Sequence, residues 1–286
     1  MSFYKINYEQ FRQQPEITEM LAALERGFEK FDVDFYLIGA VARDVWMSAI
    51  NNIAPRRTTG DIDFAVLINN KGIYEALKEY LIHVEGFDPY KENSFVLIWK
   101  DKRQVDLLPF GKIEDEDGKV TIEGTGYTSI HVPGFSEVYD NGLPEIEIGN
   151  MHTFKLCTLQ GIAVLKLIAW NDRPEVRKSD IKDISDILNH FFDMYQHEIW
   201  ENHHDLFADE NANLKHIAAR VMGREMSKIA KRNEKLFNRI EKILHDNTYD
   251  MPNSKIGAIM LEYYDNTIED NVLLLQQLKQ GFTEKI

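Results

Sequence analysis

The sequence has little cysteine, little positive charge and no long hydrophobic run, and each shortage excludes a class of protein. The single cysteine of the 286 residues, Cys157, excludes an intramolecular disulfide and a zinc cluster built from cysteines. Lysine and arginine number 33 against 47 acidic residues, and the net charge of −14 argues against a broad electrostatic grip on nucleic acid. A local basic cleft stays compatible with that charge. The longest apolar stretch, Gly161 to Trp170, contains Lys166 and is too short to span a bilayer. No signal-peptide pattern is visible, so we expect a cytoplasmic protein that binds no membrane.

The composition and the spacing of apolar residues predict a folded protein of two parts. Hydrophobic residues make up 44% of the chain, which is enough for a substantial core. Up to about residue 150, β-like runs alternate with amphipathic helical segments, whereas from Thr158 onward only helical spacing recurs. The fold class is therefore α/β (α+β): a mixed β-sheet head with flanking helices in residues 1–150, then an all-helical C-terminal domain in residues 151–286. We expect strands at residues 35–38, 61–68, 94–99 and 103–108, helices at 16–31, 40–50 and 74–84, and a β-rich extension of the sheet at 111–150.

Two aspartates one residue apart, Asp61 and Asp63, are the most informative feature of the chain. Side chains alternate between the faces of a strand, so both carboxylates would point the same way. Aspartate is disfavoured in strands, and two neighbouring carboxylates repel each other, so the pair needs a reason. A divalent cation removes the repulsion, because Mg²⁺ is usually held by one or two carboxylates together with substrate phosphates. The alternative is a polar outer strand face beside the turn at Gly60.

A third acid, Asp106, lies in the strand-like run that begins at Gln104. If that strand lies beside the first, three carboxylates can hold two ions, Mg²⁺ or Mn²⁺, for an in-line phosphoryl or nucleotidyl transfer. Asp106 would then complete the second metal site and act as general base toward an attacking hydroxyl. One acid in an apolar strand often caps or pairs instead, so a metal-binding role for Asp106 is indicated only together with Asp61 and Asp63.

A glycine that follows the expected strand at residues 35–38 offers a place for phosphate. Gly39, followed by Ala40 and a helix, would let backbone N–H groups approach a phosphate closely. Arg43, in the first turns of that helix, could meet a triphosphate with its planar donor fork. The alternatives are a simple turn at Gly39 and a surface carboxylate as the partner of Arg43.

Charged residues of the helical part also fall on shared stripes. Lys166 lies among apolar residues, where a lysine needs a partner or a ligand, and Arg173 falls near the same stripe. Asp183 and Asp186 share one stripe of a later helix, next to Lys182. These residues would contact a nucleoside triphosphate. The alternative is a solvated helix face with an internal ion pair, such as Lys166 with Asp183.

Two further groups of residues are expected to have structural rather than functional roles. His203 and His204 are adjacent in the sequence, which predicts a solvated loop rather than one metal site. The basic residues between Lys228 and Lys242 alternate with glutamates, which favours a solvent-exposed helix face over contact with an RNA backbone.

The order of these motifs resembles the nucleotidyltransferase (DNA polymerase β-like) superfamily. Its usual pattern is Gly-Gly or Gly-Ser, then Asp-x-Asp, then a third acid on a later strand; here Gly39, Asp61-Ile-Asp63 and Asp106 stand in that order. Ala40 departs from the pattern, which keeps open a nucleotide-binding module without turnover. The segment from Ile38 to Asp44 is also similar to the head of CCA-adding and poly(A) polymerases.

A closer resemblance runs from about Phe35 to His190. The segments Leu165–Arg173 and Lys178–Asp186 are similar to the Lys-x-x-Ala and Lys-Asp-x-x-Asp motifs of the AbiEii/AbiGii toxin family of nucleotidyltransferases. That resemblance implies an NTP substrate, and it implies that Lys166 neutralises phosphate charge. It also implies a toxin of a toxin–antitoxin or phage-defence system, with an antitoxin protein as partner. The acceptor stays open among RNA such as tRNA, protein and a small molecule, with an aminoglycoside-type enzyme as the alternative.

Overall fold

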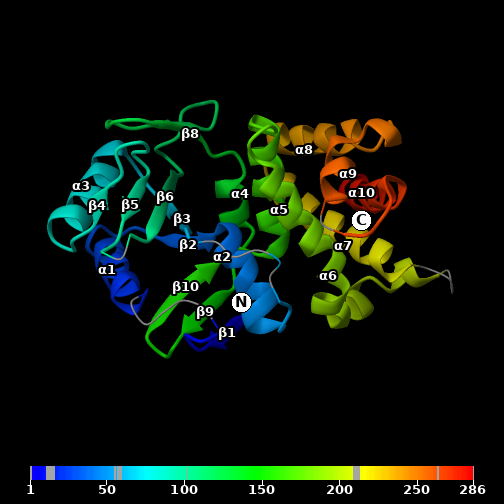
Figure 1. The fold of residues 1–286 in the computed structure, drawn as a ribbon, viewed down its shortest axis with the longest axis horizontal. Helices are drawn as coiled ribbons and strands as arrows, with labels where there is room; N and C mark the ends of the chain where they lie inside the picture. The colour runs from blue at the N-terminus through cyan, green and yellow to red at the C-terminus, as the bar shows by residue number, and fades with distance from the viewer. Residues whose placement is uncertain are drawn as a thin grey trace. The chain divides into compact units, whose positions relative to one another are not determined.

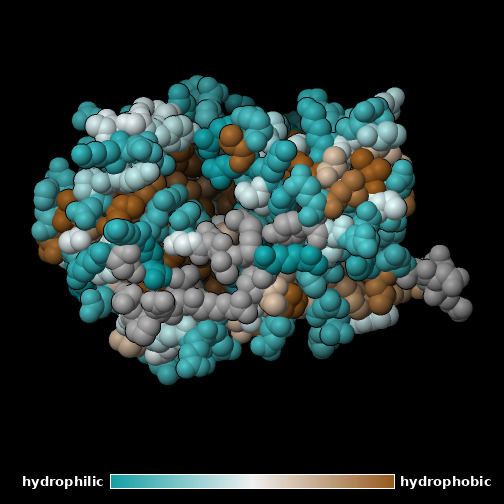
Figure 2. Space-filling view, viewed as in Figure 1, coloured by the Kyte–Doolittle hydropathy of each residue, from teal (hydrophilic) through white to brown (hydrophobic). Residues whose placement is uncertain are grey.

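The computed structural model describes residues 2–10, 17–54, 56, 60–100, 102–208, 213–262 and 264–285. The chain divides into two compact units, residues 1–158 and 159–286, which we call the head and the helical unit (Figure 1). Of the helix expected at residues 16–31, Glu16 lies outside the described ranges. Within those ranges, no helix is both long and apolar enough to cross a membrane. Most surface residues on the face drawn in Figure 2 are hydrophilic.

A mixed eight-stranded sheet forms the centre of the head, which confirms the predicted fold class. The strand order is β1-β9-β10-β2-β3-β6-β5-β4. Neighbours β3 and β6 are parallel, whereas β2 and β3 are antiparallel. Strand β10 follows the boundary expected near residue 150 and pairs with β2 inside the head. The strands are β1 (Phe3–Ile6), β2 (Phe35–Ile38), β3 (Ile62–Leu67), β4 (Asp88–Pro89), β5 (Val96–Ile98), β6 (Gln104–Phe110), β9 (Glu145–Ile148) and β10 (His152–Leu156).

Aromatic residues cover both faces of this sheet. On one face, Phe28 of α1 (Ile17–Lys30) packs on Phe35 and Phe64, with ring centroids 4.3 and 6.2 Å apart. Helix α3 (Lys71–His83) lies beside α1 (Figure 1). On the other face, Tyr36 packs on Phe110 at 5.6 Å, and its hydroxyl donates to the carbonyl of Phe135 in α4 (Phe135–Asp140). Since strand residues alternate, Asp63 projects from the same face as Tyr36.

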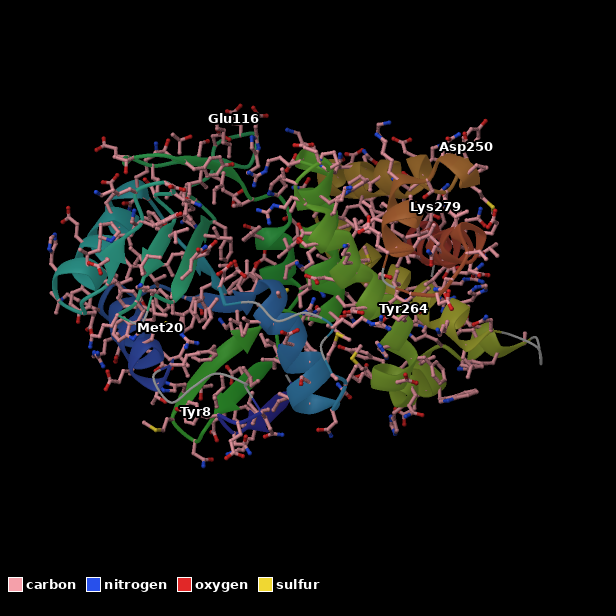
Figure 3. The ribbon with its side chains drawn as sticks, in the orientation of Figure 1. Tyr8, Met20, Glu116, Asp250, Tyr264 and Lys279 are labelled. Carbon is pink, nitrogen blue, oxygen red and sulfur yellow. The ribbon has the colours of Figure 1, made fainter. Side chains whose placement is uncertain are left out.

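The stretch at residues 111–150 differs from the expected extension of the main sheet. Strands β7 (Lys119–Thr121) and β8 (Ser129–His131) pair with each other in a separate two-stranded sheet, so the prediction was wrong for them. The chain leaves β6 at Gly111, which has a φ of 96°. A Cβ at this position would lie 2.6 Å from Cδ1 of Leu67, so only glycine fits here. The turn before β7 is exposed at Glu116 (Figure 3).

The helical unit contains helices and connecting loops, without a strand in its described part, as predicted. Helices α7 and α10 approach each other closely, because glycines stand at their crossing. A Cβ at Gly223 would lie 2.1 Å from the carbonyl oxygen of Leu278, and one at Gly281 would lie 1.8 Å from that of Arg220. The elements are α5 (Leu159–Asp172), α6 (Lys178–Asn202), η2 (His204–Phe207), α7 (Leu214–Ala230), α8 (Glu234–Asp246), η3 (Met251–Asn253), α9 (Lys255–Met260) and α10 (Ile268–Thr283).

Candidate active site

Strand register brings two of the predicted acids together. Asp63 of β3 is the register partner of Asp106 of β6, and neighbouring strands lie about 4.8 Å apart. Register partners project from the same face, so the two half-buried side chains lie next to each other. Both stand near the first residue of their strand, at the edge of the sheet where the antiparallel β2 ends.

Asp61 lies just outside the sheet. Strand β3 begins at Ile62, so Asp61 precedes the strand that it was expected to open, and it is exposed. It is two residues from Asp63, at the same edge of the sheet.

The turn after β2 fits closely against Asp63. Gly39 has a φ of 72°, and a Cβ at this position would lie 2.1 Å from Oδ2 of Asp63. Any larger residue would therefore be strained in its backbone and would collide with the carboxylate. The close approach of Asp63 to this backbone depends on glycine at position 39.

Helix α2 (Gly39–Asp44) begins at this turn and continues as the π-helix η1 (Val45–Ile50). The N-cap residue is Ile38, whose side chain makes no capping hydrogen bond, and Ala40 is buried. The groups that this turn can offer to an anion are therefore its backbone N–H groups.

Arg43 was expected to contact a triphosphate, but the structure buries it completely. Its Nε donates to Oδ1 of the neighbouring Asp44 at 2.9 Å. A carboxylate partner, the alternative for Arg43, is thus present in the adjacent Asp44. Phosphate contact by Arg43 stays a prediction.

Gln104 orients Asp106. The two residues stand two apart on one face of β6, and Nε2 of Gln104 donates to Oδ1 of Asp106 at 2.8 Å. Nearby, the buried Tyr74 hydroxyl donates to the carbonyl of Leu107, and burial together with the charge of Asp106 raises the pKa of Tyr74 well above its ordinary value. The sequence analysis missed Gln104, although its spacing from Asp106 was the available signal.

The acids of the head suit a cation that arrives with a ligand. Within the described residues, no three His, Cys, Asp or Glu side chains are close enough to hold a metal ion. Asp63 and Asp106 nevertheless supply adjacent carboxylate oxygens, the donors that Mg²⁺ prefers. Because one or two carboxylates are usually completed by substrate phosphates, this donor set fits the ion.

In the helical unit, two carboxylates hold Lys166. Nζ of Lys166 lies 2.8 Å from Oδ1 of Asp180 and 2.8 Å from Oδ2 of Asp183. Burial alone would lower the pKa of Lys166, but the charges of Asp180 and Asp183 outweigh it and raise the pKa. The internal ion pair is thus present, and contact of Lys166 with a nucleotide stays a prediction. Asp180, which the sequence analysis missed, stands one helical turn before Asp183.

The other predicted residues of the helical unit are dispersed among separate contacts. Asp186 is buried, and its Oδ1 accepts a hydrogen bond of 2.7 Å from the hydroxyl of Tyr264, which Figure 3 labels. Nζ of Lys182 lies 2.6 Å from Oε2 of Glu262. Arg173 follows the last residue of α5 and is exposed. Nucleotide contact by these residues also stays a prediction.

His203 does not lie in the expected solvated loop. It is 9% exposed, and its Nδ1 lies 3.1 Å from Nη1 of Arg224. Burial lowers the pKa of His203, so the ring is neutral at pH 7 and accepts this hydrogen bond. The prediction was wrong because the chain at η2 folds back against α7, whereas His204 is exposed.

A comparison with protein families finds a match over most of the chain. The family described as nucleotidyl transferase AbiEii toxin, Type IV toxin–antitoxin system, matches residues 22–254. That span contains every predicted site residue, from Gly39 to Asp186. No curated protein matches the sequence.

Two solved structures are similar to the chain at low identity. The solution structure of the antibiotic-resistance factor ANT(2'')-Ia has 12% identity and a TM-score of 0.36, over 83% of this chain and 100% of that one. The Thermotoga maritima CCA-adding enzyme, solved with tRNA, has 14% identity and a TM-score of 0.28, over 95% of this chain and 69% of that one. Similarity at this level does not inform the function of the chain.

Proposed function

Because the chain belongs to the AbiEii family of nucleotidyltransferases, we propose that it transfers a nucleoside monophosphate from an NTP to an acceptor hydroxyl, with Mg²⁺ bound at Asp63 and Asp106. The observation that carries the metal assignment is the register of β3 and β6, which sets these two aspartates side by side. Two adjacent carboxylates disfavour each other's charge, and a bound cation removes that cost.

Each residue at this edge of the sheet has a task in the proposal. Asp63 and Asp106, joined by Asp61, would hold the cation, and the cation would neutralise phosphate charge. Gln104 keeps Asp106 in one orientation through its hydrogen bond. Gly39 has no side chain, so the N–H groups of the first turn of α2 can approach the phosphates.

The transfer exchanges one phosphorus–oxygen bond for another. The acceptor oxygen bonds to the α-phosphorus while the bond from that phosphorus to the bridging oxygen breaks, and pyrophosphate leaves. The proton of the acceptor hydroxyl passes to Asp106, acting as general base. Positioning and charge neutralisation supply most of the acceleration.

The residues of the helical unit divide into two groups in this proposal. Arg173 is exposed, so a phosphate can reach its guanidinium group from solvent. Lys166, Asp183 and Asp186 are buried in contacts of their own, so their first task is to hold the helices together. A nucleotide that reached Lys166 would have to compete with two carboxylates.

The family supports a toxin as the biological role and an antitoxin as its partner. For the acceptor, the net charge of −14 opposes broad contact with an RNA backbone. A protein or small-molecule hydroxyl, or an RNA end held by a local basic patch, accords better with that charge. The same observation favours the second candidate, an enzyme that modifies a small molecule.

The decisive experiment offers each α-labelled NTP with Mg²⁺ to the purified chain, together with total tRNA, cell protein or small hydroxylated molecules. Pyrophosphate release and label on the acceptor are measured for wild type, Asp63→Asn and Asp88→Asn. Asp88 is an exposed head carboxylate on β4, so its variant is the matched control.

Label on one acceptor class, lost in Asp63→Asn and kept in Asp88→Asn, would establish the transfer and name its acceptor. Bound NTP without transfer to any class, unchanged by Asp63→Asn, would show a nucleotide-binding module instead.

A further inference from the structure

A pocket lies entirely inside the helical unit. It has a volume of about 530 Å³, which lies in the range of small-molecule sites. Its wall is formed by the start of α5, the second half of α6, η2 and α7. None of the residues predicted for nucleotide transfer lines it, so its ligand needs an explanation of its own.

An aromatic wall forms one side of this pocket. Helix α6 loses its regular geometry at Tyr195, where φ is −121° and ψ is 16°. The ring of Tyr195 stacks on Phe191, with centroids 4.6 Å apart and planes 17° apart. Ile199 and Val221 add aliphatic surface. This wall can receive a hydrocarbon chain or a ring, and its aromatic faces attract a cation.

The basic residues that line the pocket are already engaged. Arg224 binds Asp205 in a two-pronged contact, at 2.9 and 2.6 Å, and it also binds Glu284. Lys228 lies 2.6 Å from Oε1 of Glu225. The buried His203 is neutral at pH 7. A phosphate or carboxylate ligand would therefore find each cation already paired.

The groups that remain are acceptors. Oε1 of Gln160 is buried and has no hydrogen-bond partner in the described structure. Glu198 also lines the pocket and is exposed, and it makes no hydrogen bond or ion pair with a described residue. Its pKa is raised first by burial and then by the neighbouring charge of Glu225. An incoming ligand must bring hydrogen-bond donors and positive charge.

We propose that this pocket binds a small organic amine. Its ammonium group would lie at Glu198, a donor would reach Oε1 of Gln160, and its hydrocarbon part would pack on Phe191 and Tyr195. The site is independent of nucleotide transfer, since it shares no residue with the edge of the sheet in the head.

The test is isothermal titration calorimetry of the full chain at about 150 mM salt, where long-range attraction is screened. The probes are spermidine, an aliphatic amine, and tyramine, an aromatic one. The variants are Glu198→Gln and Gln160→Met. The matched control is Glu201→Gln, an exposed acid on the same helix that lies outside the pocket. Thermal unfolding of each variant confirms that it is folded.

We expect at least one amine to bind at one site per chain. Glu198→Gln should weaken it about tenfold or more, as the loss of a charge-assisted hydrogen bond does. Gln160→Met should weaken it by a smaller factor, and Glu201→Gln should leave it within about twofold. Binding of neither amine overturns the proposal. Equal weakening by Glu198→Gln and Glu201→Gln also overturns it, because it would show attraction by the acidic surface as a whole.

Discussion

The head and the helical unit both hold aspartates close together, but they deal with the charge in different ways. In the helical unit, Asp180 and Asp183 share the ammonium group of Lys166. In the head, strand register aligns Asp63 with Asp106, with the backbone of Gly39 against Asp63. Acids neutralised by a buried cation join helices to each other. Acids aligned on neighbouring strands concentrate negative charge at one place, which suits the cation of the proposed function.

The largest effect that separates the two regions is expected at Asp63 and Asp106. Replacing either by asparagine should lower nucleotidyl transfer by at least ~100-fold, the size of a lost electrostatic group at a reaction centre. The free energy of unfolding should change little, because neither side chain is fully buried. Transfer rates and urea unfolding of each variant measure both effects, with Asp88→Asn as control. A large loss of stability would instead assign these acids a structural role.

The opposite pattern is expected at Lys166. Lys166→Met would leave Asp180 and Asp183 buried without their cation, and should lower the free energy of unfolding by about 3–5 kcal/mol. Lys182→Met removes a partly exposed pair with Glu262 and should cost less than about 1 kcal/mol. Urea unfolding followed by tryptophan fluorescence compares the two. If Lys166→Met unfolds like wild type but needs far more NTP for transfer, Lys166 is a nucleotide contact after all.

Two glycines with similar backbone geometry test whether the contact between Gly39 and Asp63 matters for transfer. Gly39→Ala and Gly142→Ala both put a side chain at a positive φ, 72° and 89°, so each should cost about 1–2 kcal/mol. A Cβ at Gly142 meets nothing within 4 Å, whereas one at Gly39 would displace Asp63. Transfer should therefore fall about tenfold or more in Gly39→Ala alone. Equal activity of the two variants would show that the position of Asp63 does not matter.

The smallest effect concerns acid stability in the helical unit. Nε of Arg220 lies 3.0 Å from Oε2 of Glu284, and Arg224 binds the other oxygen. Burial alone would raise the pKa of Glu284, but Arg220 and Arg224 outweigh it and lower the pKa below its ordinary value. A carboxyl with a lowered folded pKa stabilises the protein above its unfolded pKa, and that stabilisation is lost as the pH falls through the folded pKa.

Wild type should therefore lose stability below a pH of about 4.3. Glu284→Gln should be less stable than wild type at pH 7, and the difference should shrink as the pH falls below that value. Urea unfolding midpoints of wild type and variant at pH 7 and below a pH of about 4.3 measure the effect. The variant Glu175→Gln, at an exposed position, serves as control. A difference independent of pH would mean that the charge of Glu284 contributes nothing.

Local features of the sequence predicted much of the head. Each of these features depends only on residues close together in the sequence. They are the two-residue spacing of Asp61 and Asp63, the apolar runs of β2 and β3, and the glycine between strand and helix. The prediction required β3 and β6 to lie side by side, and the structure pairs them in parallel. The separate pairing of β7 with β8 was not predicted, because the turn at Gly111 redirects the chain and strand-like residues do not specify their partner strand.

The contacts of the helical unit were harder to predict. Lys166 with Asp183 could be proposed from stripes on two helices, but Asp180 could be added only once the packing of α5 on α6 was known. Tyr264 lies far along the chain from Asp186, so no spacing rule relates them. His203 was misjudged because its burial depends on how η2 packs against α7, and a pair of adjacent histidines carries no information about that.

The glycine crossing of α7 and α10 also orders events during synthesis. The sheet of the head needs nothing beyond β10, so all of its strands are translated before the helical unit. Helix α7 cannot take its final neighbour until α10 has been translated, since Gly223 meets Leu278 and Gly281 meets Arg220. The nascent chain thus completes the acids of the head first and exposes the apolar side of α7 longest. During that interval a chaperone can reach the apolar side of α7.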